Sequence, residues 1–268
     1  MMAKPVTLIT GASAGIGAAL AREFASHGHE LVLVARRVEP LERLSDEIEA
    51  SGKTRPQIVT ADLTATATTL AIASELSSRG VDPNFVVNNA GFGLFGNAAE
   101  LPRDEQLAMI DLNARVLTDL SLRFIDSLER HRGGILNVAS VASFLPGPGI
   151  AVYYATKAYV LSFSEALHHE LKPKGIRVTA LCPGPVPTEF QARSGIPHDY
   201  FPAILNRSAE RVARDGYRGL MAGRRVVVPG FANRVAAFLP RLVPRASALS
   251  IGSKLRKRWQ RSHARSSD

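Results

Sequence analysis

Short apolar runs rich in β-branched residues alternate along the chain with longer stretches in which apolar positions recur at helical spacing. This alternation is typical of β-α-β units, whose parallel strands are joined by helices. The runs are continuously apolar, as in residues 31–34 (LVLV), which indicates strands covered by helices on both faces. We predict strands at residues 6–10, 31–35, 57–60, 85–88, 135–139, 176–181 and 226–228.

The intervening segments predict helices, among them residues 15–27, 40–50, 64–78 and 151–171. Pro173 and Gly175 end the last of these, because proline cannot continue a helix and glycine accepts the left-handed conformation that often follows one. Together these elements predict an α/β fold: a doubly wound, seven-stranded parallel sheet with helices on both faces. We place this fold in one domain, residues 1–231, followed by a C-terminal extension, residues 232–268.

Composition indicates a globular protein and limits the cellular compartments in which we expect it. With 46% hydrophobic and 21% charged residues among 268, the chain can bury a full core. A single cysteine, Cys182, excludes an intrachain disulfide, and the seven histidines show no metal-ligand spacing, so we expect no metal. No apolar stretch reaches the ~20 residues of a membrane span, and no signal sequence precedes the first strand. We therefore expect a cytoplasmic protein that does not cross a bilayer.

The net charge of +9 is concentrated at one end of the chain. Residues 234–268 hold nine Lys or Arg residues and one acidic residue, for a net charge of +8, whereas the preceding residues are nearly balanced. A strongly basic protein often binds nucleic acid, but here the excess charge lies outside the predicted domain. We therefore expect no nucleic-acid partner.

The C-terminal extension combines this charge with apolar residues. Residues 231–255 mix apolar pairs with arginines, and Pro240 and Pro244 prevent one continuous helix. In residues 254–261, cations surround Trp259, a pattern that suits the surface of an anionic membrane. Peripheral membrane contact is therefore one interpretation of the extension. A solvated tail and packing on a neighbouring subunit are the alternatives.

A glycine-rich turn, residues 10–17 (TGASAGIG), joins the first predicted strand to a helix. Its glycines permit positive φ and close backbone approach, so a pyrophosphate can rest on the amides of the helix N-terminus. The spacing G-x-x-x-G-x-G differs from the common dinucleotide pattern G-x-G-x-x-G, and a tight turn without a ligand would need similar residues. The position after the first strand of an α/β sheet favours a dinucleotide site.

Two arginines, Arg36 and Arg37, follow the second predicted strand, and Arg36 lies 19 residues after Gly17. NAD sites usually carry an acidic residue here for the ribose 2′-hydroxyl, whereas a guanidinium pairs with the 2′-phosphate of NADP. The pair therefore favours NADP(H) as the cofactor. A solvated arginine pair at a strand end is the alternative.

Candidate chemistry lies on the longest predicted helix. Tyr153 and Lys157 are four residues apart and so share a helix face. A nearby ammonium lowers the pKa of a phenol and would fit Tyr153 for proton transfer. Ser140 follows the strand at residues 135–139, at the edge of the sheet where α/β proteins build active sites. A tyrosine four residues before a lysine also occurs by chance, so the pair alone does not define a site.

These motifs, taken in order, resemble the classical short-chain dehydrogenase/reductase family over residues 5 to about 230. The motifs are the turn at residues 10–17, Asp62 and Leu63, the run NNAG at residues 88–91, Asn113, Ser140, Tyr153 with Lys157, and Pro183, Gly184, Val186 and Thr188. The resemblance implies a Rossmann fold, an NADP(H)-dependent oxidoreductase and a homo-oligomer, either a dimer or a tetramer.

The resemblance also implies roles for single residues. Tyr153 would be the general acid/base, Lys157 would lower its pKa and hold the ribose hydroxyls, and Ser140 would orient the substrate oxygen. Asn113 would anchor the water of a proton relay. The spacing of 13 between Ser140 and Tyr153 agrees with the family and favours Ser140 over Ser143. The implied cofactor contacts are Gly11, Ser13, Ala14, Gly15, Ile16, Gly17, Arg36, Arg37, Asp62, Leu63, Asn89, Ala90, Gly91, Tyr153, Lys157, Pro183, Gly184, Val186 and Thr188.

Three of these positions have structural alternatives. Asp62 would cap a helix that begins at residue 64, and Thr188 would cap the helix that follows it. Asn113 would be a poor helix former on a polar face.

The substrate region is expected in residues 188–207, which together with Phe92, Phe95, Phe144 and Leu145 would close an apolar pocket. No convergent pair of cations is evident for an anionic substrate, so we expect a hydrophobic ketone, aldehyde or alcohol. An idle NADP-binding sensor on the same fold is the alternative function, but it has no need of Ser140, Tyr153 and Lys157 together. A further alternative is an epimerase or dehydratase of the extended short-chain dehydrogenase/reductase family, which also uses a tyrosine and a lysine. The glycine turn usual in those enzymes differs from the one in this sequence.

Overall fold

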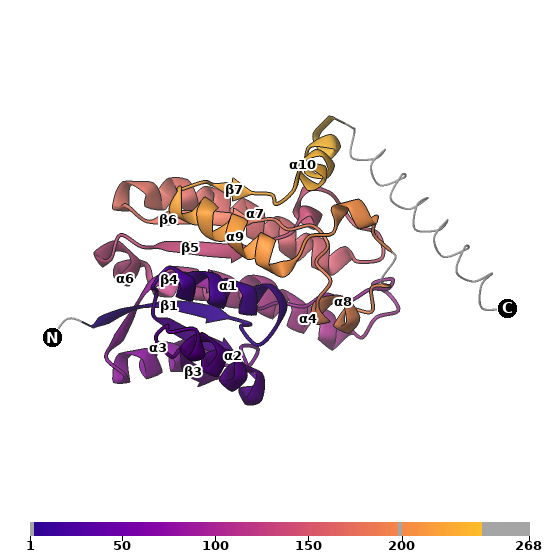
Figure 1. Cartoon of the computed structure of the whole chain (residues 1–268). Helices are drawn as coiled ribbons and strands as arrows, with labels where there is room; N and C mark the ends of the chain where they lie inside the picture. The colour runs from indigo at the N-terminus through magenta and orange to yellow at the C-terminus, as the bar shows by residue number, and fades with distance from the viewer. Residues whose placement is uncertain (1–2, 198–199, 243–268) are drawn as a thin grey trace.

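The structure, a computed structural model, describes residues 3–197 and 200–242. Within these residues, seven parallel strands form one sheet in the order β3-β2-β1-β4-β5-β6-β7 (Figure 1). The strands are β1 (Lys4–Thr10), β2 (Leu31–Ala35), β3 (Gln57–Thr60), β4 (Val81–Asn88), β5 (Gly134–Val138), β6 (Arg177–Leu181) and β7 (Val226–Val227). The prediction of a doubly wound parallel sheet is confirmed.

Helices cover both faces of this sheet (Figure 1). One face packs against α1 (Gly15–Ser26), α2 (Val38–Ala50) and α9 (Ala209–Met221). The other face packs against α3 (Thr68–Ser78), α5 (Leu117–Arg123), α6 (Ile125–Arg130) and α7 (Ala151–Leu171). The shorter helices near the carboxyl ends of the strands are α4 (Arg103–Ile110), α8 (Glu189–Arg193) and α10 (Phe231–Phe238).

Cover on both faces explains why the strands are continuously apolar. In β2, Leu31 and Leu33 pack in the core with α1, α2 and α9, while Val32 and Val34 pack in the opposite core. All four side chains are buried. Because successive side chains of a strand point to opposite faces, a strand between two helical layers needs apolar residues throughout.

Two predicted element starts differ from the structure by four residues, whereas the other predicted bounds differ by at most two. Helix α3 begins at Thr68 rather than at residue 64, because the preceding residues form turns and Ala67 has a left-handed φ of 60°. Strand β4 begins at Val81 rather than at residue 85. Pro83, which lacks an N–H, fits into this strand because the pairing with β1 skips Asn84 and forms a bulge there.

A buried polar network fixes α7 relative to the centre of the sheet. Asn88 on β4 donates through Nδ2 to Asn137 Oδ1 on β5 (2.9 Å) and to Ser121 Oγ on α5 (3.0 Å). Asn137 in turn donates through Nδ2 to Ser164 Oγ on α7 (2.9 Å). Buried hydrogen-bonded networks of this kind specify one arrangement of the elements they join. The network therefore sets the position of α7, the helix that carries Tyr153 and Lys157.

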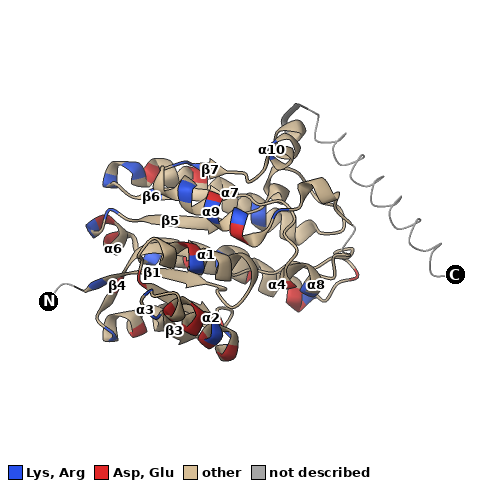
Figure 2. Cartoon of the chain, in the orientation of Figure 1, with Lys and Arg blue, Asp and Glu red and all other residues tan. Residues whose placement is uncertain are grey.

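Basic and acidic residues are interspersed along the helices of the described chain (Figure 2). Arg22 and Glu47, for example, form an ion pair. None of the helices described here is long and apolar enough to cross a membrane. The predicted boundary at residue 231 coincides with the first residue of α10. Residues 243–268, which include Trp259 and its neighbouring cations, lie outside the described residues, so the division into domain and extension stays a prediction.

Candidate active site

The glycine turn between β1 and α1 is built for close backbone approach. Gly11 (φ +64°) and Gly15 (φ +56°) adopt the left-handed conformation that favours glycine. At Gly17, a Cβ atom would lie 2.2 Å from the Gly11 carbonyl oxygen. The N-cap residue of α1, Ala14, offers no side-chain hydrogen bond, and the first turn holds no acidic residue. The amides at this helix end are therefore left for an anion such as a pyrophosphate.

Thr10 and Asn89 hold this turn against the end of β4. Thr10 Oγ1 accepts hydrogen bonds from the backbone N–H groups of Asn89 and Ala90, both at 3.1 Å. Asn89 Nδ2 donates to the carbonyl oxygens of Thr10 (2.9 Å) and Gly11 (3.1 Å). The loops after β1 and β4 therefore form one rigid unit at the carboxyl edge of the sheet.

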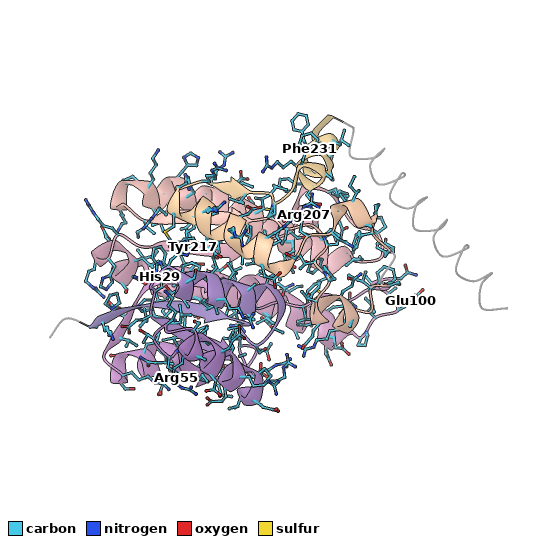
Figure 3. All side chains as sticks on the ribbon, in the orientation of Figure 1. His29, Arg55, Glu100, Arg207, Tyr217 and Phe231 are labelled. Atoms are coloured by element: carbon cyan, nitrogen blue, oxygen red, sulfur yellow. The ribbon has the colours of Figure 1, made fainter. Side chains whose placement is uncertain are left out.

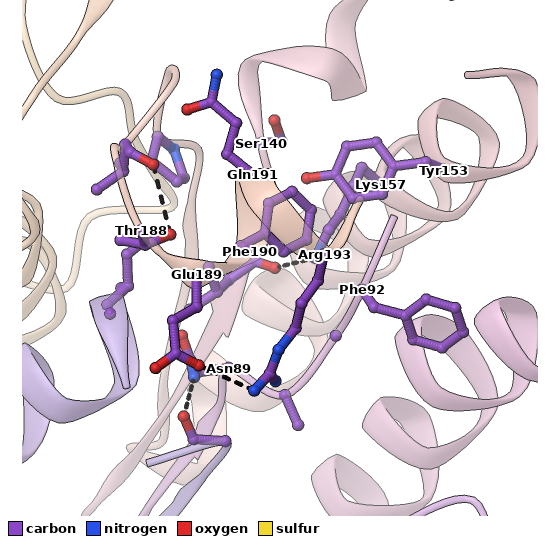
Figure 4. A pocket seen from close by; sticks show the side chains of 18 of the residues that line it. Asn89, Phe92, Ser140, Tyr153, Lys157, Thr188, Glu189, Phe190, Gln191 and Arg193 are labelled. Atoms are coloured by element: carbon purple, nitrogen blue, oxygen red, sulfur yellow. Dashed lines mark hydrogen bonds and ion pairs between the residues drawn. The ribbon is translucent and has the colours of Figure 1, made fainter. Parts of the chain in front are cut away.

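A cavity of about 690 Å³ lies at this edge. Figure 4 shows Ser140, Tyr153 and Lys157 on one side of it and Thr188 and Glu189 on the other. Two predicted site residues, Gly17 and Asn113, do not line the cavity and pack behind it. The predicted residues that do line it are Gly11, Ser13, Ala14, Gly15, Ile16, Arg36, Arg37, Asp62, Leu63, Asn89, Ala90, Gly91, Ser140, Tyr153, Lys157, Pro183, Gly184, Val186 and Thr188.

Lys157 is held tightly beside Tyr153. Its side chain is 5% exposed, and Nζ donates to the carbonyl oxygen of Val138 at 2.8 Å. Nζ also lies 5.8 Å from the centre of the Tyr153 ring. Ser143 Oγ donates to the backbone carbonyl of Lys157 (2.7 Å). Ser143, which the spacing from Tyr153 disfavours as the catalytic serine, therefore supports helix α7. The contact with Val138 joins α7 to the last residue of β5, two residues before Ser140.

Burial dominates the electrostatics of this pair. It raises the pKa of Tyr153 to about 12, against a smaller opposing effect from a hydrogen bond with Ser140. It lowers the pKa of Lys157 to about 8. The expected lowering of the tyrosine pKa by Lys157 is not found, because burial raises this pKa and the opposing contribution comes from Ser140 and not from Lys157.

Asn113 joins two parts of the site from behind. It lies in a π-helical segment, η1 (Asp111–Val116), and is 1% exposed, so the alternative of a polar helix face is wrong. Its Oδ1 accepts from the Phe92 N–H (3.1 Å), while Nδ2 donates to the Phe92 carbonyl (2.9 Å) and to Thr156 Oγ1 (3.1 Å). The side chain therefore ties the loop after β4 to α7. Such π-helical turns are frequent at functional sites.

Arg36, Arg37 and Asp62 line the end of the cavity near β2 and β3. Arg36 is exposed and has no hydrogen-bond or ion-pair partner among the described residues. Asp62 Oδ1 accepts from the N–H (2.9 Å) and hydroxyl (2.7 Å) of Thr64. These bonds, with a smaller contribution from Arg36, lower the pKa of Asp62. Asp62 thus closes a turn and does not cap α3, which begins at Thr68.

Arg37 differs from its neighbour, because it is ion-paired across the cavity. It donates through Nη2 to Glu189 Oε2 at 2.8 Å, and the same oxygen accepts from Arg193 at 2.9 Å. The Glu189–Arg193 bond is drawn in Figure 4. Sequence reasoning missed Glu189 and Arg193, since 152 positions separate Arg37 from Glu189 and no local pattern links them. Thr188, the residue before α8, makes no side-chain cap bond.

The remaining wall of the cavity is largely apolar. Of the apolar residues predicted for a substrate pocket, those that line it are Phe92, Leu145, Phe190, Ile196, Phe201 and Leu205. The residues expected in the pocket that do not line it, which corrects that part of the prediction, are Phe95, Phe144, Pro197, Tyr200 and Ile204. Phe95 instead packs edge-on against Tyr200, with ring centres 5.0 Å apart. Within the described residues, no group of three His, Cys, Asp or Glu side chains is placed to hold a metal.

Comparison with known proteins agrees with this architecture. A profile of the family described as short chain dehydrogenase matches residues 5–197. A sulfoacetaldehyde reductase from Chromohalobacter salexigens is 37% identical over 218 residues, which cover 80% of this chain and 81% of that protein. A short-chain dehydrogenase from Sphingobium yanoikuyae, solved in complex with NADPH, has a TM-score of 0.77 and 32% identity, covering 92% of this chain and 95% of that one.

A second solved structure, a 3-ketoacyl-(acyl-carrier-protein) reductase from Brucella melitensis complexed with NADH, has a TM-score of 0.73 and 30% identity, covering 86% of this chain and 97% of that one. The fold and the cavity define a nucleotide-binding oxidoreductase of the Rossmann type. The chain belongs to the short-chain dehydrogenase family. The resemblance deduced from the sequence motifs is thereby confirmed.

Proposed function

We propose that this protein is an NADP(H)-dependent oxidoreductase that interconverts a carbonyl group and an alcohol on a hydrophobic substrate. The observation that carries the proposal is the convergence of Ser140, Tyr153 and Lys157 on the same cavity as the glycine turn. A dinucleotide sensor would need the turn, but it would not need a hydroxyl, a phenol and an ammonium gathered on the opposite wall.

The residues at the glycine turn fit a dinucleotide. The backbone amides of residues 13–16 at the uncapped end of α1 would hold the pyrophosphate, and Arg36 would pair with the 2′-phosphate. Asn89, Gly91 and Thr188 would hold the cofactor further along the cavity. When bound, the nicotinamide supplies or accepts the hydride. Support for NADP(H) comes from the unpaired Arg36 and from the relative solved with NADPH.

Proton transfer falls to Tyr153. With a pKa of about 12, the phenol is protonated at neutral pH and can donate its proton to the substrate oxygen during carbonyl reduction. Ser140, whose hydroxyl faces the same cavity, orients that oxygen. Lys157, with a pKa of about 8, is mainly cationic at pH 7 and stabilises the negative charge left on the phenol. Asn113 holds the Phe92 loop against α7 so that the site keeps its shape.

The apolar wall predicts the substrate preference. Purified protein should oxidise NADPH in the presence of bulky apolar ketones or aldehydes, and more slowly with small hydrophilic ones. The reason is that the apolar wall around Phe190 favours binding mainly by removing apolar substrate surface from water. The measurement is the loss of NADPH absorbance over a panel of ketones, aldehydes and acyl thioesters. NADPH binding without turnover of any compound in the panel would instead favour the sensor.

Cofactor preference tests the role of Arg36. In the variant Arg36→Asp, the Kd for NADPH should rise about tenfold, while the Kd for NADH changes little, because the lost guanidinium contacts only the 2′-phosphate. Fluorescence titration of both reduced cofactors measures the two constants. Arg43→Asp is a matched control, since Arg43 is an exposed α2 arginine that does not line the cavity. Equal affinities of the wild-type protein for NADH and NADPH would remove the case for NADP(H).

A further inference from the structure

Helix α10 and its continuation carry a stripe of exposed apolar side chains. Phe231 is 77% exposed, Val235 40%, Phe238 55% and Leu239 52%. The spacing of these positions, i, i+4, i+7 and i+8, places them on one helix face. Phe231 lies at the outer edge of the molecule (Figure 3). Single exposed apolar residues are ordinary, but a contiguous set marks an interaction surface.

The opposite face of α10 is anchored to the domain. Asn233 is fully buried, and its Nδ2 donates to the carbonyl oxygens of Leu205 (3.0 Å) and Pro229 (2.9 Å). Gly184 packs so closely on Asn233 that a Cβ atom there would lie 2.3 Å from Oδ1. Ala237 is buried as well. The helix is therefore fixed in orientation, and its apolar stripe cannot turn inward without breaking these contacts.

The charge of the chain from α10 onward indicates what covers the stripe. Residues 231–268 contain nine Lys or Arg residues and one acidic residue, Asp268, for a net charge of +8. A second copy of the chain, seated on the stripe, would bring another segment of net charge +8 close to the first, and like charges at an interface oppose association. An anionic surface would neutralise the segment instead. Apolar side chains beside a run of cations are the combination that binds the interface of anionic membranes.

We propose that α10 and the basic segment after it dock the protein on the surface of an anionic lipid bilayer. In this arrangement Phe231, Val235, Phe238 and Leu239 enter the headgroup region, and the Lys and Arg side chains pair with lipid phosphates. With eight residues, α10 is far too short to span a bilayer, so it lies on the surface. The proposal does not depend on the enzyme's chemistry, because membrane binding is measured without turnover.

Co-sedimentation of the full chain with vesicles tests the proposal. Vesicles of phosphatidylcholine containing phosphatidylglycerol should retain the protein at low salt, and vesicles of phosphatidylcholine alone should retain much less. High salt should weaken retention, because it screens exposed charges. A triple variant, Arg256→Gln, Lys257→Gln and Arg258→Gln, should weaken it in the same way.

The apolar stripe needs a separate variant. Phe231→Ser combined with Phe238→Ser should reduce vesicle affinity more than about tenfold, because two phenylalanines no longer leave water on binding. Leu70→Ser with Leu122→Ser is the matched control, since it removes two apolar side chains that are 54% and 47% exposed on other helices. Circular dichroism and thermal melting show whether each variant is folded.

Each outcome decides the question. Retention that depends on anionic lipid, on low salt and on Phe231 with Phe238 supports the proposal. No retention of the intact protein overturns it, as does retention that is unchanged in the Phe231→Ser, Phe238→Ser variant. An oligomer that dissociates in that variant, without lipid binding by the wild-type protein, overturns it in favour of an interface between copies of the chain.

Discussion

Tyr153→Phe should lower kcat by a factor of about 10² to 10⁴, the range assigned to general acid/base catalysis, and should leave NADPH affinity nearly unchanged. Only the phenolic hydroxyl is lost, so the ring keeps its contact with Phe190, whose centre lies 5.6 Å away. Steady-state kinetics with the best ketone of the panel measures kcat, and fluorescence titration measures NADPH binding.

Tyr154→Phe provides the matched control. Tyr154 also lines the cavity, and burial raises the pKa of its phenol, but its ring packs against Gly147. It is adjacent to Tyr153 and so points away from the helix face shared with Lys157. We expect near-normal kcat for this variant. If Tyr154→Phe lost activity and Tyr153→Phe kept it, the assignment of the proton donor would be wrong.

Gly17→Ala should raise the Kd for NADPH about 100-fold. The added Cβ would lie 2.2 Å from the Gly11 carbonyl oxygen and 2.5 Å from Asn89 Nδ2, so the backbone of the cofactor turn must move. Overpacking of this kind costs about 1–3 kcal/mol, and the upper end of that range corresponds to about two orders of magnitude in affinity. Titration with NADPH and a thermal melt of the same sample measure affinity and stability together.

Gly216→Ala separates this effect from simple destabilisation. Gly216 is also a helical glycine, but the nearest atom to its added Cβ would be Leu181 Cδ2, the end of a flexible side chain, at 2.8 Å. Gly216 does not line the cavity, so the melting temperature should fall while NADPH affinity holds. Wild-type affinity in Gly17→Ala would show that the turn does not hold the cofactor.

Features set by neighbouring residues could be predicted from the sequence. The strands were identifiable because cover on both faces requires unbroken apolar runs, as in β2. The glycine turn and the pairing of Tyr153 with Lys157 were identifiable because each depends on spacing within one turn and helix. Their assembly into one cavity follows from the strand order, since the ends of β1, β4 and β5 are adjacent.

Features set by distant partners could not be predicted in this way. The sequence presents Arg36 and Arg37 as an equivalent pair, and only the fold brings Glu189 to one of them. In the sequence Asn113 resembles an ordinary polar helix residue, because its hydrogen bonds with Phe92 and Thr156 form only in the folded chain. The pKa of Tyr153 depends on burial by the assembled site, which outweighs the effect expected from a lysine one helical turn away.

The Arg37–Glu189 ion pair has a consequence for changing the cofactor preference of this enzyme. Both partners are substantially exposed, so the pair adds little to global stability, but it couples the loop after β2 to the start of α8. Replacing Arg37 would leave Glu189 paired with Arg193 alone and uncouple the loop after β2 from α8, next to the apolar wall that begins at Phe190, so that a gain with one nicotinamide would come with altered substrate selection. Replacing Arg36 carries no such penalty. In the divergence of related enzymes, positions 37 and 189 would then evolve together, while position 36 would vary alone with the cofactor.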